Sequence, residues 1–338
     1  MSRGTTEGPS DPGLVRSRRF SGVSTVRLIS TRLVGEALSK MAPVPRLRPV
    51  PGWCFGDPDR PGTGMNVRFK IYKALRRSRL EVTVRANWHG GTSVDVTLPS
   101  DFGRCLWVAG CFEPNETAFL ASVLKPGMTF VDIGANIGLY TLLAAPLVAP
   151  GGIVVAVEPS PREQVTLMRN LAANDQFAVR VRAEALGMAD GSAILHVTDA
   201  EHAGQNTLGA PTYADTGVVE EIEVPVRAFD RLVDEEGLER IDAVKIDVEG
   251  AEELVLRGGQ VSLRRFRPLV LLELQDPSLR TLDSSAEGVI SLLESLDYRV
   301  VGYSKRTGRP ERSPFRIDQK TDSANVVAYP IERVDDLT

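Results

Sequence analysis

The chain has 338 residues, of which 42% are hydrophobic and 25% are charged, and its formal net charge is −4. This length accommodates one large domain or two smaller ones, and the composition is typical of a globular protein. The slightly negative charge gives no support to a nucleic-acid partner. The most apolar window, 141–157, contains two prolines and two glycines and is too short to cross a bilayer, so we expect no membrane span.

Residues 1–60 are rich in arginine, proline and glycine. They lack the uninterrupted apolar segment of a secretory signal, and the acidic residues Glu7 and Asp11 argue against an organelle transit peptide. We interpret this segment as a disordered leader or as the product of an over-extended start site.

The three cysteines, Cys54, Cys105 and Cys111, are odd in number and lack the spacing of metal ligands. We therefore predict no metal site, and free thiols in a reducing compartment, which favours a cytoplasmic protein. The sequence gives no indication of the oligomeric state.

Residues 61–125 are expected to form a β-hairpin and a helix that cap the main domain. Polar and apolar residues alternate over most of 80–98, on both sides of the turn sequence Asn-Trp-His-Gly-Gly. Asn115 is the expected N-cap of a helix over 116–124, which leads directly into the first core strand. Glu113 is then either a cofactor contact or a surface carboxylate, and the sequence leaves both interpretations open.

Residues 126–160 contain one βαβ unit. An apolar strand over 129–133 ends in the turn Gly-Ala-Asn-Ile-Gly, and good helix formers follow over 139–148. A second buried strand, 153–157, ends at Glu158. This order of strand, glycine-rich turn, helix and strand predicts a ligand site at the ends of the two strands.

The chemistry of the turn favours an adenosine-type ligand. Gly134 and Gly138 have no Cβ, so the ligand can approach the backbone and the turn can take positive φ. Unpaired N–H groups at the start of the next helix can bind an anionic group, and Glu158 can accept both ribose hydroxyls. The dinucleotide fingerprint G-x-G-x-x-G is absent, because Asn136 occupies the place of its middle glycine. The preceding acid, Asp132, suits an ammonium group without a pyrophosphate, which is the character of S-adenosylmethionine.

The next segment is expected to supply a third strand over 179–183 and then Leu186, where the backbone in such folds often contacts an adenine edge. Alternating residues on both sides of the polar loop 199–218 predict a hairpin. A loop of this length inside a compact core is unusual and often functional. We interpret it as a substrate loop that carries His202, with a mobile insertion as the alternative.

Asp247 and Glu249 follow a short buried strand over 243–246. Ligands of open α/β sheets bind outside the carboxyl ends of the strands, so Asp132, Glu158 and Asp247 are expected on one rim. Charges at strand ends cost free energy unless they are paired, which favours a functional role for Asp247.

Three further strands are expected over 269–274, 298–303 and 324–329, and the last two are expected to be antiparallel because no helix joins them. The sequence therefore predicts an α/β fold over residues 126–335. Its sheet should have seven mostly parallel strands, helices on both faces and an antiparallel hairpin at one edge.

Several of these segments together resemble the FkbM family of S-adenosylmethionine-dependent methyltransferases, over about residues 105–330. The shared motifs are Gly110-x-Phe-Glu-Pro, Val131-Asp-Ile-Gly-Ala-Asn-Ile-Gly, Val157-Glu-Pro-Ser, Lys245-Ile-Asp-Val-Glu-Gly-Ala-Glu, Pro268-Leu-Val-Leu-Leu-Glu-Leu and Asn325-Val-Val-Ala-Tyr-Pro. The element Asp-x-Gly-x-Asn-x-Gly is common to many methyltransferases, whereas its combination with Lys-Ile-Asp-Val-Glu-Gly is more specific. The resemblance implies a class I, Rossmann-like methyltransferase fold, S-adenosylmethionine as cofactor, and O-methylation of a sugar or secondary metabolite.

Methyl transfer to a hydroxyl requires alignment of the two reactants and removal of one proton. Asp247 is the first candidate to orient the acceptor hydroxyl or to take its proton, and Glu249 and His202 are weaker candidates. A divalent cation held by Asp247 and Glu249 is an alternative that we do not favour. The residues predicted to bind the cofactor are Glu113, Asp132, Gly134, Asn136, Gly138, Glu158 and Leu186.

Two other functions remain open from the sequence. A nucleotide-dependent oxidoreductase can use the same βαβ unit, although the missing dinucleotide fingerprint argues against it. The second open function is a non-catalytic cofactor-binding module. The acidic residues at the predicted site argue against it. The expected acceptor is a hydroxyl of a small molecule or glycan, whose identity the sequence does not indicate.

Overall fold

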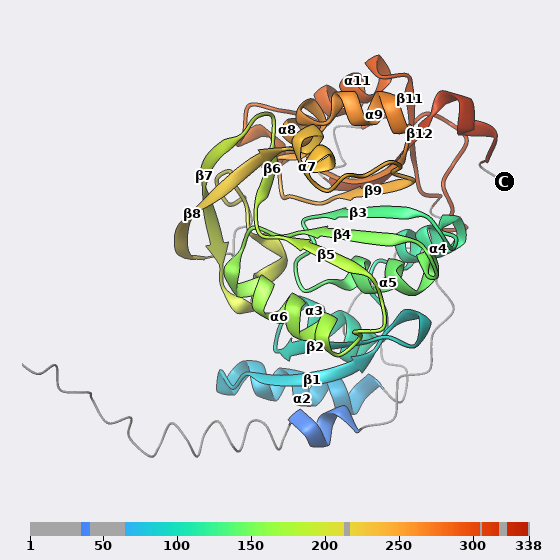
Figure 1. Cartoon of the computed structure of the whole chain (residues 1–338). Helices are drawn as coiled ribbons and strands as arrows, with labels where there is room; N and C mark the ends of the chain where they lie inside the picture. The colour runs from blue at the N-terminus through green and yellow to red at the C-terminus, as the bar shows by residue number, and fades with distance from the viewer. Residues whose placement is uncertain (1–34, 41–64, 213–216, 305, 318–322, 337–338) are drawn as a thin grey trace, which may run out of the picture.

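The computed structural model describes residues 35–40, 65–212, 217–304, 306–317 and 323–336 (Figure 1). Most of the leader expected over 1–60, with Cys54, lies outside the described residues. Within the described part of the chain, Cys105 and Cys111 form no disulfide bond. None of the described helices has both the length and the apolar character needed to cross a bilayer.

A seven-stranded sheet forms the centre of the molecule (Figure 1). Its strands are β3 (Thr129–Ile133), β4 (Ile153–Val157), β5 (Val179–Arg182), β9 (Ala243–Ile246), β10 (Leu269–Gln275), β11 (Tyr298–Gly302) and β12 (Ser323–Pro330). They lie in the order β11-β12-β10-β9-β3-β4-β5. The strands from β10 to β5 are parallel, whereas β12 is antiparallel to both β10 and β11. The predicted mostly parallel sheet with an antiparallel edge hairpin is therefore confirmed.

Helices cover both faces of this sheet. The first face packs against α4 (Pro114–Val123), α5 (Leu139–Val148) and α6 (Pro161–Ala172). The second packs against α7 (Phe229–Glu235), α8 (Glu252–Gly258), α9 (Gln260–Phe266) and α11 (Ala286–Ser295), while the short α10 (Asp276–Arg280) follows β10. Side chains alternate along β3, so that Phe130 faces the first group and Val131 the second. Because both faces are covered, every residue of β3 and β9 is buried, which explains their continuous apolar character.

A separate three-stranded sheet stands beside the central one. It consists of β6 (Ala185–Gly187), β7 (Gly191–Thr198) and β8 (Val218–Ala228), in the order β6-β8-β7. The antiparallel pairing of β7 with β8 confirms the predicted hairpin. The loop between them contains the 3₁₀ turn η3 (Ala200–Gln205), and residues 213–216 of the loop lie outside the described part.

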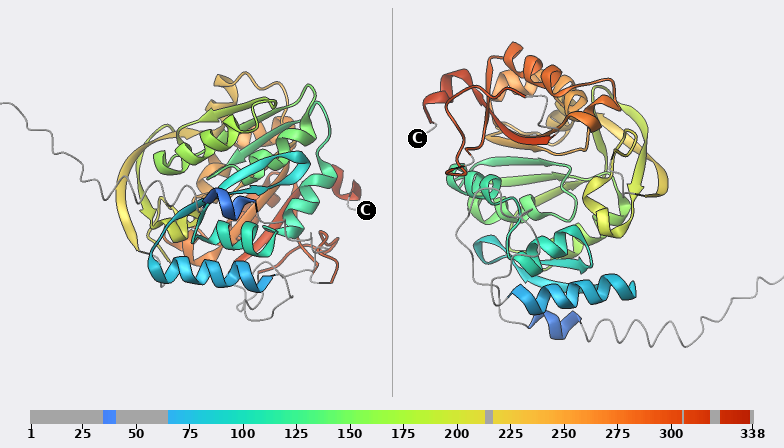
Figure 2. Two further views of the ribbon diagram at one scale, coloured as in Figure 1. Left: turned by 90° about the horizontal axis from the view of Figure 1, so that it is seen from below. Right: turned by 180° about the vertical axis from the view of Figure 1, so that it is seen from behind.

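The N-terminal described segment forms a layer under α5, on the side away from the central sheet (Figure 2). It contains the helix α2 (Met65–Ser78), the strand β1 (Val82–Asn87), the 3₁₀ turn η1 (His89–Gly91) and the strand β2 (Ser93–Leu98). The two strands form the expected antiparallel hairpin. The layer is tied to the domain through Trp88, whose Nε1 donates to the carbonyl oxygen of Leu139 over 2.8 Å.

The connection into β3 differs from the sequence prediction in one detail. After α3 (Asp101–Gly103) and a π-helical turn (Arg104–Ala109), α4 begins at Pro114, so the expected N-cap Asn115 lies inside the helix. Proline is favoured at the first helical position because its missing N–H would have no partner there. The residue before it, Glu113, has a φ of 39° and makes no side-chain cap, which leaves its carboxylate available to the interior. A final 3₁₀ turn, η4 (Ile331–Asp336), follows β12.

Candidate active site

The turn after β3 is built against the segment that follows β9. Gly134 has a φ of 80°, and a Cβ at this position would lie 1.8 Å from the carbonyl oxygen of Asp247. The N–H groups of Gly134 and Ala135 donate to the carbonyl oxygen of Val157, at 3.0 and 2.9 Å. Glycine is required both for the positive φ and for this close approach, so the turn, β4 and Asp247 form one rigid unit.

Glu158 connects the turn to the end of β4. Its carboxylate accepts hydrogen bonds from the backbone N–H groups of Asn136 and Ser160, both at 2.8 Å. The side chain is only 4% exposed, and burial raises its pKa to about 8. The residue is therefore a partly desolvated acceptor at the place where the sequence predicts ribose hydroxyls.

Asp132 lies deeper than the sequence suggested. It is fully buried, and its Oδ2 accepts a hydrogen bond from Thr141 Oγ1 at 2.6 Å, while Oδ1 has no hydrogen-bond partner among the described residues. Burial raises the pKa of this carboxyl. Asp132 faces α5 and is absent from the walls of both cavities described below, so it supports the turn from behind.

The main cavity has a volume of about 800 Å³ and opens at the carboxyl ends of β3, β4 and β9. Six residues predicted to form the site lie on its wall: Gly134, Asn136, Glu158, Leu186, Asp247 and Glu249. The remainder of the wall is largely apolar and includes Phe102, Phe112 and Leu195. A mostly apolar cavity with a few convergent polar groups is typical of a small-molecule site. Gly138, the last glycine of the turn, precedes α5 and does not line it.

A second, much smaller cavity adjoins the main one and shares Tyr140, Lys245 and Asp247 with it. Its wall is formed by Glu113, Glu116, Tyr140, Lys245, Asp247, Leu271, Leu272, Glu273, Asn325 and Val326. Glu113 accepts a hydrogen bond from the Tyr140 hydroxyl, and burial raises the pKa of Glu113 to about 8. Glu113 is thus an interior residue, and it faces the second cavity rather than the main one.

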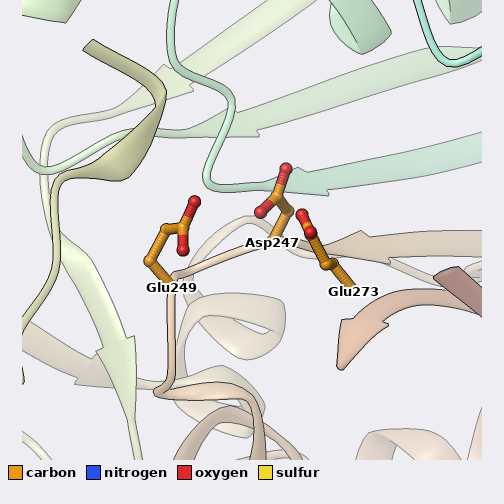
Figure 3. Close-up of side chains that lie close together, drawn as sticks. All are labelled: Asp247, Glu249 and Glu273. Carbon is orange, nitrogen blue, oxygen red and sulfur yellow. The ribbon is translucent and has the colours of Figure 1, made fainter. Parts of the chain in front are cut away.

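Three carboxylates converge between the ends of β9 and β10 (Figure 3). One oxygen each of Asp247, Glu249 and Glu273 lies within 4.8 Å of the other two. Burial raises the pKa of Glu273 to about 7 and that of Glu249 well above its usual value. Glu249 has a φ of 53°, which turns the chain sharply after β9 and directs its side chain back toward Asp247. Oxygen ligands in this arrangement have the chemistry that a hard divalent cation prefers, so the cation alternative gains a third potential ligand.

Lys245 is a site residue that the sequence reasoning missed. It is 7% exposed, its Nζ lies 2.7 Å from Asp247 Oδ2, and it sits 4.5 Å from the centre of the Tyr140 ring. Burial alone lowers the pKa of Lys245, but the carboxylates of Asp247, Asp132 and Glu113 together raise it above its usual value. A signal was present, because residues two apart in an extended segment face the same side, as Lys245 and Asp247 do.

The polar loop reaches the main cavity, although His202 does not. Gly204, Asn206 and Leu208 lie on the wall, whereas the His202 Nδ1 is 2.9 Å from Asp199 Oδ1 and the residue lines neither cavity. The Asn136 side chain donates to the carbonyl oxygen of Ala203 at 2.7 Å, which joins the loop to the turn after β3. The loop therefore closes one side of the cavity through its backbone and small side chains.

Comparison with known proteins agrees with this geometry. The family model described as the methyltransferase FkbM domain matches residues 132–300, which is half of the chain. The chain belongs to the FkbM methyltransferase family. The match begins at Asp132 and includes the turn after β3, Glu158 and the segment around Asp247. The resemblance inferred from the motifs is confirmed, and the order and direction of the sheet strands agree with the predicted class I, Rossmann-like fold.

Individual relatives cover different parts of the FkbM-family chain. The 31-O-demethyl-FK506 methyltransferase FkbM of Streptomyces tacrolimicus is 29% identical over 53% of this chain and 75% of its own length. Methyltransferase sdnD of Sordaria araneosa is 30% identical over 44% of this chain and 66% of its own length. The AMB antimetabolite synthetase AmbE of Pseudomonas aeruginosa is 30% identical over 53% of this chain, which covers 10% of AmbE. The chain thus spans between a tenth and three quarters of these curated relatives.

Solved structures give more distant similarities. The crystal structure of methyltransferase FkbM from Methylobacillus flagellatus KT aligns with 79% of this chain and 60% of that chain, at 14% identity and a TM-score of 0.38. A SAM-dependent O-methyltransferase from Thermotoga maritima aligns with 64% of this chain and 65% of that chain, at 14% identity and a TM-score of 0.35. Neither similarity assigns a substrate.

Proposed function

We propose that the protein transfers a methyl group from S-adenosylmethionine to a hydroxyl of a small molecule or glycan. The observation that carries this proposal is the meeting of three predicted elements on one cavity wall: the glycine turn after β3, Glu158 at the end of β4 and Asp247 at the end of β9. The family assignment favours methyl transfer over the oxidoreductase and the non-catalytic module that the sequence left open.

The residues of the main cavity fit this cofactor. The space that a Cβ at Gly134 would fill is already taken by the Asp247 backbone, so the turn keeps one shape against which a ligand can bind. We assign Gly134 and Asn136 to the methionine moiety, Glu158 to the ribose hydroxyls and Leu186 to the adenine. Asp132 and Gly138 act indirectly, by supporting the turn and the start of α5. When bound, S-adenosylmethionine supplies an already activated methyl group.

The protein's remaining tasks are to align the acceptor oxygen with that methyl group and to handle one proton. Alignment of two reactants can contribute about 7–11 kcal/mol, and a positioned base typically adds about 10²–10⁴-fold. Asp247 lies on the wall between the two cavities and is held by Lys245, so we assign it to orient the acceptor hydroxyl or take its proton. Glu249, with its raised pKa, is the second candidate for the base. His202 remains the weakest candidate, since it is engaged by Asp199 away from the wall.

Donor binding is the first test of this function. We expect S-adenosylmethionine to bind and NAD to bind at least about 100-fold more weakly, as measured by quenching of tryptophan fluorescence. The variant Gly134→Ala should raise the dissociation constant of S-adenosylmethionine at least about 100-fold, because its Cβ displaces the Asp247 backbone. Gly127→Ala is the matched control: its φ of 83° is nearly the same, but a Cβ there meets no atom within 4 Å.

A transfer assay then tests the acceptor class. Radiolabelled methyl donor is supplied with panels of glycan and polyketide-like alcohols, and label should appear in an ether linkage. Tighter binding of NAD than of S-adenosylmethionine would contradict the proposed cofactor. Label on nitrogen or carbon of the acceptors, in place of oxygen, would contradict O-methylation. Thermal unfolding of both alanine variants separates loss of binding from loss of folding.

A further inference from the structure

Positive charge is concentrated in the N-terminal part of the chain. Residues 1–80 contain 16 of the 40 lysines and arginines but only 5 of the 44 acidic residues. The formal net charge of −4 therefore combines a basic segment with a strongly acidic remainder. Such an asymmetry indicates an anionic partner for the basic part. Within this segment, residues 65–80, which include α2, contain six basic residues and no acidic one.

One face of α2 packs against the rest of the N-terminal layer. Arg68, Tyr72 and Leu75 are buried, and they recur at the spacing of a single helical face. Arg68 donates to the carbonyl oxygen of Trp107, and its guanidinium lies 5.0 Å from the centre of the Trp107 ring. The charge of Arg68 is therefore used inside the fold.

The opposite face of α2 carries the other basic side chains of this segment. Five of them are exposed: Lys70, Lys73, Arg76, Arg77 and Arg79, the last of which follows the end of the helix. Lys70, Arg77 and Arg79 make no ion pair with a residue that the structure describes. Clusters of about four to eight lysines and arginines on an amphipathic helix are typical of proteins that bind anionic lipids.

The shape of this face favours a broad anionic surface as the partner. Helix α2 runs along the outer edge of the molecule, so its exposed side is convex (Figure 2). Proteins that bind single-stranded nucleic acid combine a basic groove with aromatic rings on which bases stack. The half-buried ring of Phe69 is covered by Lys73, whose Nζ lies 4.3 Å from the ring centre. Val67 is exposed three residues before Lys70 and adds an apolar contact on the same side.

The basic face adjoins the loop that closes the main cavity. Arg76 Nε lies 2.7 Å from Oε1 of Glu201, which belongs to η3 in that loop. Phe102 of α3 lies beside the same turn, since a Cβ on Gly204 would be 3.4 Å from the Phe102 ring. Phe102 and Gly204 both line the main cavity. A partner bound along α2 is therefore on the loop side of the candidate active site.

We propose that the exposed face of α2 binds the anionic surface of a membrane, with the protein lying on the lipid headgroups. The lysines and arginines contact lipid phosphates and carboxylates, and salt weakens this attraction. The inference is independent of the proposed function, because none of the five exposed basic residues lines either cavity.

Sedimentation with lipid vesicles tests the membrane partner. The full-length protein is mixed with vesicles of phosphatidylcholine alone, or of phosphatidylcholine and phosphatidylserine in equal parts. We expect the mixed vesicles to bind the protein at least about tenfold more tightly, and binding to weaken as the NaCl concentration is raised. Equal affinity for the two kinds of vesicle, or no binding to either, overturns the proposal.

A triple variant assigns the binding to α2. Replacing Lys70, Arg77 and Arg79 together by glutamine should weaken binding to the mixed vesicles at least about tenfold, because each basic residue near the surface contributes about fivefold. Glutamine has nearly the same helix propensity as lysine and arginine, so the helix should be retained. Wild-type affinity in this variant overturns the assignment to α2.

A matched control removes three exposed positive charges elsewhere: Arg264→Gln and Arg265→Gln on α9, together with Arg306→Gln between β11 and β12. The control should bind the mixed vesicles like the wild-type protein. A loss as large as that of the α2 variant would show that net charge alone decides binding, and would overturn the assignment. Both triple variants should unfold at the same temperature as the wild-type protein.

Competition with duplex DNA separates lipid from nucleic acid as the partner. The DNA is added until its phosphate concentration equals that of the lipid in the mixed vesicles. The protein should remain with the vesicles. Release of the protein onto the DNA overturns the membrane partner in favour of nucleic acid.

Discussion

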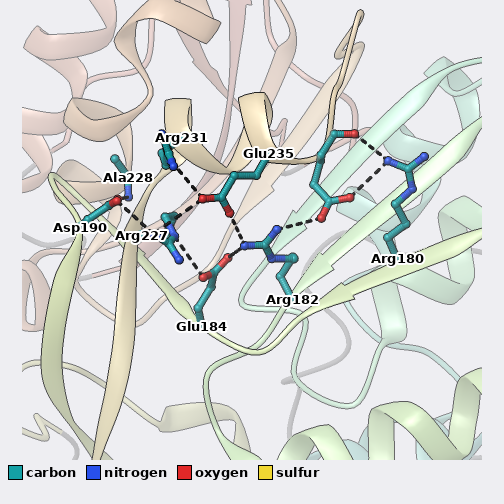
Figure 4. A network of polar contacts seen from close by, with 9 residues as sticks. Arg180, Arg182, Glu184, Asp190, Arg227, Ala228, Arg231 and Glu235 are labelled. Atoms are coloured by element: carbon teal, nitrogen blue, oxygen red, sulfur yellow. Dashed lines mark hydrogen bonds and ion pairs between the residues drawn. The ribbon is translucent and has the colours of Figure 1, made fainter.

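Two regions of the molecule contain clusters of charged side chains. They differ in how far the carboxylates are balanced by positive charges. In the candidate site, Asp247, Glu249 and Glu273 converge (Figure 3), and Lys245 pairs with Asp247. Between β5, β8 and α7, arginines and carboxylates alternate in a surface network (Figure 4). There Arg182 alone contacts three carboxylates, those of Glu184, Glu235 and Glu236, at 2.7–3.0 Å.

The pKa values of the carboxyl groups are shifted in opposite directions in the two regions. Burial raises the pKa of Glu273 to about 7 and that of Glu158 to about 8. In the network, a hydrogen bond from Arg182 lowers the pKa of Glu235, and one from the Ala228 backbone N–H lowers that of Asp190. The network carboxylates therefore stabilise the fold when ionised, whereas the site carboxylates destabilise it. Carboxylates that destabilise the folded protein when they are ionised are expected where a ligand or a reaction uses them.

The largest expected effect is the loss of activity on removal of the Asp247 charge. Asp247→Asn should lower kcat by about 10²–10⁴-fold, because an amide cannot take the acceptor proton. Donor affinity should stay within a few-fold, since Glu158 and the turn after β3 are unchanged. Steady-state methyl transfer and donor titration measure the two quantities.

Asp242→Asn is the matched control for that variant. Asp242 precedes β9 as Asp247 follows it, and it pairs with Arg240, but it lines neither cavity. Its kcat should be unchanged. Normal turnover in Asp247→Asn would remove Asp247 from the mechanism. Loss of wild-type activity on treatment with a chelator, restored by a divalent cation, would favour the cation alternative instead.

A smaller effect is expected in the pH dependence of donor binding. If the ionised Glu158 accepts the ribose hydroxyls, binding below pH 8 must displace its proton, so affinity should fall as the pH is lowered. The loss is at most about tenfold per pH unit below about pH 8. Isothermal titration calorimetry between pH 6 and 8.5 measures this slope.

Glu158→Gln provides the comparison for that slope. The donor's own amino group titrates in the same range, so the difference between the variant and the wild-type protein is the informative quantity. The variant should bind S-adenosylmethionine more weakly than the wild-type protein at pH 8.5. Its affinity should also depend less steeply on pH, because the contribution of Glu158 is missing. Identical slopes in the two proteins would show that Glu158 does not titrate on binding.

Strands β3, β4, β9 and β10 could be predicted because they are short, mostly apolar runs that are largely buried on both faces. Helix α2 was not predicted, because five of its fourteen residues are arginine or lysine and one of these, Arg68, is buried. Its Arg68 donates to the carbonyl oxygen of Trp107 at 2.6 Å, a contact that appears only after folding.

Part of the candidate site could likewise be predicted from the sequence, and part of it could not. Glu158 and Asp247 could be placed on one rim because each ends a parallel strand. The alternation along β3 turns the side chain of Asp132 toward Thr141 of α5, so Asp132 does not line the main cavity. The meeting of Glu113 with Glu273 in the second cavity depends on α4 and β10, whose juxtaposition follows from strand order and from no local pattern.

The smallest expected effects are changes in the free energy of unfolding. Neutralising a carboxylate should change it in opposite directions in the two charged regions. Because the folded-state pKa of Glu273 is raised from its usual 4.5 to about 7, the folded protein binds the proton more tightly and loses stability as the pH rises between these values. Glu273→Gln should therefore raise the free energy of unfolding by about 1–3 kcal/mol at pH 8 and leave it unchanged near pH 4.5. Urea unfolding across this range measures the difference.

Glu235→Gln should show the opposite sign. The pKa of Glu235 is lowered in the folded state, so its stabilising contribution is present above its unfolded pKa and disappears as the pH falls through the folded value. The variant should be less stable than the wild-type protein at pH 7, by no more than about 2 °C in Tm, and the difference should shrink in high salt because Glu235 lies at the surface. Methyl transfer should be unaffected, since Glu235 lines neither cavity. A gain of stability in Glu235→Gln at pH 7 would show that the ionised carboxylates of the network, like those of the candidate site, destabilise the folded protein.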